Sequence, residues 1–87
     1  MEEQNDITMK KSVNTPYGTV STGTNIRIIK MFDTTTPSRA FPDGIDHEAR
    51  KMNGRTGKVT WIDGAGALHG TWGGLAVLPE CDVFSVI

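Results

Sequence analysis

The chain has 87 residues, with 9 basic and 10 acidic side chains and a formal net charge of −1. This length allows one small domain, and the near-neutral charge argues against a surface devoted wholly to nucleic acid, which is usually strongly basic. No apolar run approaches the ~20 residues of a transmembrane helix, and the acidic N-terminus lacks the apolar segment of a signal peptide. The single cysteine, Cys81, forms neither an internal disulfide nor a thiolate zinc site alone, so we expect a cytoplasmic protein.

The first 22 residues are expected to form a flexible N-terminal tail. Residues 1–12 are polar and lack apolar periodicity, a composition typical of mobile segments. Residues 13–23 are rich in Thr, Ser, Gly and Asn, and they predict a β-turn followed by a short edge strand at residues 19–21. We place the compact domain at residues 23–87.

The first core strand is predicted at residues 24–32, where Ile26 and Ile28 fall on one face. The alternation slips at Ile29. Such a slip indicates a β-bulge or a strand end that is buried on both faces.

Residues 33–53 predict a long loop with a short helix near its end. Asp46 can cap the helix start, Ala49 and Met52 lie on one side, and Gly54 can end the helix. Loops of this length in small domains are usually functional or flexible.

Residues 54–74 contain seven of the ten glycines and predict a strongly bent pair of strands. Val59 and Trp61 are expected on one face of the first strand, and Leu68 and Trp72 on one face of the second.

The turn of this hairpin is predicted at residues 63–66. Further strands are expected at residues 75–78 and 83–87, with a proline-containing break between them. The side chains expected to point into one core are Val59, Leu68, Val77 and Phe84. The predicted fold is mostly β, a small five-stranded SH3-like barrel with a long first loop that carries a short helix.

Three ordered motifs support this fold by resemblance. They are Gly54-x-x-Gly57-x-Val59-x-x-Ile62-Asp63, Gly66-x-Leu68-His69-x-x-Trp72-x-Gly74-x-x-Leu78 and Asp82-x-Phe84-x-Val86-Ile87. Together they resemble small SH3-like domains of unknown function from genomes, phages and conjugative elements of Gram-positive bacteria. Residues 54–62 also resemble the hairpin of KOW domains. The resemblance implies a fold, whereas the family carries no established activity.

No catalytic constellation is recognisable in the sequence. Cys81 and His69 have the chemistry of a thiolate–imidazolium pair, but no local motif supports one, and a single cysteine is more often a small apolar group. The acids and histidine at residues 43–48 have the chemistry of metal ligands, but the solvated start of a capped helix is the better explanation of them. We therefore predict no enzymatic activity, no cofactor and no metal.

Basic and aromatic side chains are the candidates for a binding surface. Seven bases and four acids lie from Arg27 to Lys58, and no base follows Lys58, an asymmetry that can steer a charged partner. An outward-facing tryptophan could stack on a base or anchor a protein. The candidate binding residues are Arg50, Lys51, Arg55, Lys58, Trp61, His69 and Trp72.

The sequence thus predicts a non-catalytic binding module, and a protein partner ranks first because of the net charge. The alternative is a nucleic-acid-binding SH3/KOW-like domain, whose bases would contact phosphates while a tryptophan stacks. A structural or oligomerising subunit is the third option, and no membrane partner is expected. The family's presence on mobile elements implies an accessory protein that binds a host protein, including an inhibitor of a defence system similar to anti-CRISPR proteins.

Overall fold

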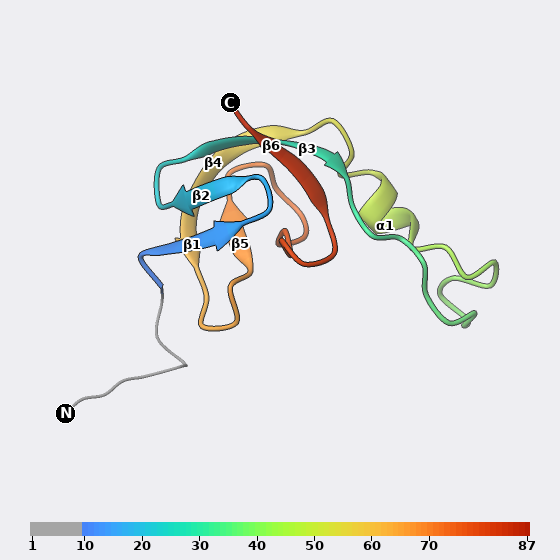
Figure 1. Cartoon of the computed structure of the whole chain (residues 1–87). Coiled ribbons are helices and arrows are strands. Elements are labelled where there is room, and N and C mark those ends of the chain that lie inside the picture. Colours follow the sequence, from blue (N-terminus) through green and yellow to red (C-terminus); the bar gives the residue numbers. More distant parts are fainter. Residues whose placement is uncertain (1–9) are drawn as a thin grey trace.

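The computed structural model describes residues 10–87, and residues 1–9 of the expected tail lie outside this range. The described chain folds into six strands and one short helix (Figure 1). The strands are β1 (Ser12–Thr15), β2 (Gly18–Ser21), β3 (Asn25–Lys30), β4 (Thr56–Ile62), β5 (Leu68–Gly70) and β6 (Val83–Val86), and the helix is α1 (His47–Arg50). The protein is therefore mostly β, as the sequence predicts.

The strands form two antiparallel sheets that do not close into a barrel. β1 and β2 pair with each other, and the other four strands pair in the order β5-β4-β3-β6. Two backbone hydrogen bonds link the β2–β3 connection to β4: the amide of Gly23 donates to the Val59 carbonyl (2.7 Å), and the amide of Val59 donates to the Thr24 carbonyl (2.8 Å). The expected barrel of five strands is thus replaced by six strands in two sheets.

The β1–β2 hairpin packs on the same hydrophobic core as the four-stranded sheet. Val20 of β2 is fully buried, and Val13 and Tyr17 pack against the core from its margin. The Tyr17 ring meets the buried Phe84 ring edge-on, with 4.8 Å between ring centroids. Residues before Gly23 therefore contribute to the packed part of the molecule, because three side chains of the hairpin bury apolar surface there.

The core side chains come from both sheets, from α1 and from the chain between β5 and β6. The four residues predicted to point inward, Val59, Leu68, Val77 and Phe84, are all buried in it, which confirms their predicted orientation. Of the two alternatives for the slip at Ile29, the structure agrees with the bulge, because the β3–β6 register shifts there and the Ile29 side chain is exposed and not buried.

Helix α1 is a single turn near the end of the long loop, beyond the C-terminal end of β3 (Figure 1). Its cap is the predicted one, since the Asp46 carboxylate accepts a hydrogen bond from the Ala49 amide (3.1 Å). Ala49 and Met52 are buried, and Gly54 follows with a positive φ of 90°. This turn of helix therefore closes one side of the core.

The strand expected at residues 75–78 is reduced to one bridge between Val77 and Leu68. Side chains occupy the backbone groups that a neighbouring strand would need. The indole Nε1 of Trp72 donates to the Leu75 carbonyl (2.8 Å), and the Asp82 carboxylate accepts from the Leu78 amide (2.7 Å). The Leu75 and Leu78 side chains are exposed, whereas Val77 is buried.

Candidate functional site

Trp61 points outward from β4, which corrects the expectation that it shares a face with Val59. Val59 pairs with Gly70, whereas Trp61 pairs with His69, so the register between β4 and β5 shifts after Val59. A bulge of this kind re-aims the next side chain. Val59 is fully buried, while 40% of the Trp61 surface remains exposed.

His69 and Asp63 hold Trp61 in place. The imidazole of His69 stacks on the indole, with ring centroids 3.9 Å apart and planes 11° apart. His69 Nε2 donates to Asp63 Oδ2 (3.0 Å), and the Ala65 and Ala67 amides donate to Asp63 Oδ1 (3.0 and 2.9 Å). The hydrogen bond from His69, followed by those from the two amides, lowers the pKa of Asp63. The predicted turn at residues 63–66 thus also orients the aromatic pair.

Two bases lie on the same outward side of the four-stranded sheet as Trp61. Lys58 lies between Gly57 and the buried Val59, and Arg27 lies between the buried Ile26 and Ile28, so both basic side chains are exposed. We call the outward surface formed by Arg27, Lys58, Trp61 and His69 the sheet face.

Trp72 is a core residue, with only 6% of its surface exposed, and it cannot serve as the outward tryptophan. The residues at positions 57 and 70 must be small so that the Trp72 indole can pack against them. A Cβ at Gly70 would come within 2.2 Å of the Trp72 ring, and one at Gly57 within 3.0 Å of it. From the sequence these glycines are expected only at turns or bends, whereas in the fold they also make room for the indole.

The remaining predicted bases do not join the sheet face. The guanidinium of Arg55 donates to the Trp72 and Gly73 carbonyls (3.3 and 3.1 Å) and thereby fixes the chain after β5. Arg50 lies in α1, where its Nε donates to the Asp33 carboxylate, and Lys51 forms the C-terminal cap of the helix. Of the seven candidate binding residues, the structure therefore brings together Lys58, Trp61 and His69.

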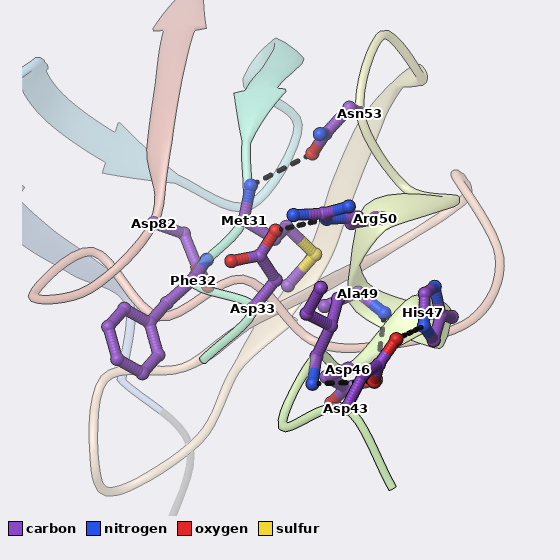
Figure 2. Close-up of polar contacts among 11 residues, drawn as sticks. Met31, Phe32, Asp33, Asp43, Asp46, His47, Ala49, Arg50, Asn53 and Asp82 are labelled. Carbon is purple, nitrogen blue, oxygen red and sulfur yellow. Dashed lines mark hydrogen bonds and ion pairs between the residues drawn. The ribbon is translucent and has the colours of Figure 1, made fainter. Parts of the chain in front are cut away.

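A second exposed aromatic side chain, Phe32, follows β3. Polar side chains hold the backbone amides of Met31 and Phe32, and the side chain of Asp33 pairs with Arg50 (Figure 2). The Met31 amide donates to Asn53 Oδ1 (2.9 Å), and the Phe32 amide donates to Oδ1 of Asp82 (2.7 Å), whose surface is 2% exposed. Asp33 receives the hydrogen bond from Arg50, which lowers the pKa of this carboxyl.

The Phe32 ring projects away from these polar contacts (Figure 2), and 60% of the residue surface is exposed. Other large apolar side chains stand exposed around it. We call this group the Phe32 patch; it consists of Phe32, Leu75, Leu78 and Val83. The sequence did not predict this patch as a site, although it shows an aromatic residue, Phe32, at the end of the first predicted strand.

Grooves run through the Phe32 patch. One, of about 310 Å³, is lined by Phe32, Leu75 and Leu78, and another, of about 280 Å³, by Phe32 and Val83. A larger hollow of about 410 Å³ shares Leu78 and Cys81 with the first groove and extends to the β1–β2 hairpin. The hollows therefore adjoin one another around residues 78–81.

The acids and histidine at residues 43–48 stabilise the loop and the helix. His47 Nε2 donates to the Asp43 carboxylate (2.9 Å), which also lowers the pKa of Asp43, and Asp46 is occupied as the helix cap. Within residues 10–87, no cluster of three or more His, Cys, Asp or Glu side chains is arranged to hold a metal ion. The described helix is too short to span a membrane.

The sheet face and the Phe32 patch lie toward opposite edges of the four-stranded sheet, since Trp61 and His69 belong to β4 and β5 and Val83 belongs to β6. Both surfaces lack the paired nucleophile and base, or paired carboxylates, that hydrolytic chemistry requires. Comparison of the chain with protein-family models, with curated proteins and with solved structures finds no match.

Proposed function

We propose that this protein is a non-catalytic binding module that recognises another protein through the Phe32 patch. The observation that carries the proposal is the combination of an exposed ring with a fixed backbone. The Phe32 amide is held by the buried Asp82 carboxylate and the Met31 amide by Asn53, while the Asp33 carbonyl accepts a hydrogen bond from the Asp46 amide (2.7 Å). A backbone that is already ordered loses little conformational entropy on binding.

The surroundings of Phe32 support a protein partner. Interfaces concentrate their binding energy in aromatic anchors that sit among apolar side chains excluding water. Leu75, Leu78 and Val83 provide such surroundings, and contiguous exposed apolar side chains mark interaction sites. The adjoining grooves around residues 78–81 suit an extended peptide segment of the partner.

The finer proposals from the sequence rest on the resemblance. We propose an open SH3-like arrangement, supported by the strand order β5-β4-β3-β6 and by the bridge between Leu68 and Val77. We also propose the specific role of a mobile-element or phage accessory protein that occupies a host protein, such as a component of a defence system.

The test is affinity capture from the cells that encode the protein, with quantitative mass spectrometry of the bound proteins. The full chain is compared with Phe32→Ala and with the matched control Trp61→Ala, which removes an exposed aromatic ring elsewhere. We expect a protein that binds the wild type and Trp61→Ala and is lost with Phe32→Ala. With the purified partner, calorimetry should show a loss of at least ~2 kcal/mol for Phe32→Ala, as for a hot-spot residue. Equal capture by all three chains would show that the patch is not the interface.

A further inference from the structure

The four-stranded sheet has a one-sided charge. Its strands contain three basic residues, Arg27, Lys30 and Lys58, and no acidic residue. Within residues 10–87, the acids lie in the long loop with its helix, in the β4–β5 turn and at residues 80–82, and the other three acids of the chain precede residue 10. Asp63 lies two residues after Trp61, but its carboxylate oxygens accept hydrogen bonds from His69 and from two amides of the turn. A chain that is near neutral overall therefore presents a positive strand surface.

The sheet face combines this charge with a stacking platform. His69 covers one side of the Trp61 indole at 3.9 Å, and the indole keeps 40% of its surface exposed. A planar ligand that stacks on this exposed part would extend the existing pair of rings. Nucleic-acid bases stack on aromatic side chains in this way, and such stacking tolerates any base because every base has a π-face.

The register of the strands places the bases beside the platform. Lys58 lies opposite Asn25, and Arg27 lies opposite Thr56, so the two basic residues are diagonal neighbours across the β3–β4 pair. Diagonal neighbours in an antiparallel pair are ~7–8 Å apart. Lys58 is also three residues before Trp61 on the same strand. Contacts to successive phosphates and a stacked base can therefore come from one continuous surface.

We propose that the sheet face binds single-stranded nucleic acid, with Trp61 stacking on a base and with Lys58 and Arg27 contacting phosphates. A single strand is favoured over a duplex because its bases are free to leave their own stack and lie on an aromatic ring. The proposal does not depend on the Phe32 patch, since the two surfaces share no residue.

The test is fluorescence anisotropy of the full chain with a labelled thymidine oligonucleotide and a labelled uridine oligonucleotide, each single-stranded, at about 50 mM salt. We expect binding that weakens with salt by roughly 0.7 log units of affinity per log unit of salt for each neutralised phosphate, thus a slope of about −1.4 for two phosphates. Trp61→Ala should weaken binding roughly tenfold or more, because it removes the stacking platform. Thermal unfolding of this variant checks that it is folded.

A matched pair of charge reversals separates a specific site from general charge. Lys58→Glu should weaken binding at least tenfold, whereas Lys51→Glu, the same change on α1, should weaken it less than threefold. Equal losses in the two variants would overturn the proposal, as would an affinity for both oligonucleotides that Trp61→Ala leaves unchanged. No detectable binding of either oligonucleotide at low salt would also overturn the proposal. This holds even if Trp61→Ala abolishes capture of a protein, because Trp61 would then contact a protein and not nucleic acid. Phe32→Ala should leave oligonucleotide binding intact, so failure of this proposal is distinguishable from failure of the protein interface.

Discussion

The sheet face and the Phe32 patch each present an exposed aromatic ring, but they fix it by different means. Trp61 is directed outward by a bulge in its own strand and is steadied by a ring and a carboxylate from the same hairpin. Phe32 is held by side chains from distant segments, since Asn53 and Asp82 lie 22 and 50 residues from their partners. The arrangement around Trp61 depends on one hairpin. The hydrogen bonds from the Met31 and Phe32 amides to Asn53 and Asp82, which we call the clamp, depend on the whole fold.

This difference predicts how each surface responds to damage. Loss of a side chain on the sheet face should change binding there and leave the fold intact. Loss of a clamping side chain at the Phe32 patch should destabilise the protein and loosen the patch together, because the clamp also joins β3 to the chain before β6.

The largest expected effect contrasts the two tryptophans of the β4–β5 region. Trp72→Ala should lower the free energy of unfolding by ~3–5 kcal/mol, because it leaves a buried cavity where the indole packs against Gly57 and Gly70. Trp61→Ala should lower the free energy of unfolding by only about 1 kcal/mol, because Trp61 is partly exposed and the substitution removes one aromatic stacking contact. Urea unfolding of both variants measures the difference. Similar losses would show that Trp61 is part of the core and would remove the local character of the sheet face.

The next effect tests the long-range clamp. Asp82→Ala leaves the partly buried amides of Phe32 and Leu78 without this acceptor, and since an unpaired donor costs roughly 1–3 kcal/mol when fully buried, we expect a loss of about 2 kcal/mol in the free energy of unfolding. Asp82→Asn retains one acceptor oxygen and should lose less. Urea unfolding gives the stability, and amide hydrogen exchange should show faster exchange at Phe32 than in the wild type. An unchanged unfolding midpoint for Asp82→Ala would mean that the clamp contributes nothing to the fold.

The features that could be predicted from the sequence are those set by neighbouring residues. The alternation of Ile26 and Ile28 indicated a strand, and its slip indicated the bulge at Ile29. Asp46 indicated the helix cap, and residues 63–66 indicated the hairpin turn, where Gly66 adopts a φ of 92°. In each case the cause is a backbone preference or a hydrogen bond that spans a few residues.

The features that could not be predicted depend on partners that are distant in the chain. The outward position of Trp61 follows from the register with β5, which strand periodicity alone does not reveal. The backbone of Leu75 and Leu78 is held by the side chains of Trp72 and Asp82 instead of by a neighbouring strand, which the strand pattern does not reveal. The Phe32 patch therefore became visible as a site only in the folded chain, while part of the sheet face was predicted.

The smallest expected effect compares two carboxylates at acidic pH: Asp63, which holds His69 of the sheet face, and Asp33, which follows Phe32 in the chain. Hydrogen bonds lower the pKa of Asp63 and of Asp33 below the ordinary value of 3.8. The unfolded chain therefore takes up protons at these groups before the folded chain does, so their stabilisation is present above pH 3.8 and is lost as the pH falls through the lowered values.

Asp63→Asn and Asp33→Asn should each reduce the loss of stability on acidification, and both effects should be small because both ion pairs remain accessible to solvent, with 30% of the Asp63 side chain and 51% of the Arg50 partner of Asp33 exposed. Thermal unfolding from pH 5 down to pH 2 measures the slopes, an interval that spans the ordinary and lowered pKa values. Because the two surfaces share no residue, the double variant should show the sum of the single effects. A double variant that departs from this sum would reveal coupling between the hairpin that carries Trp61 and the clamp that holds Phe32, and would contradict the independence of the two surfaces.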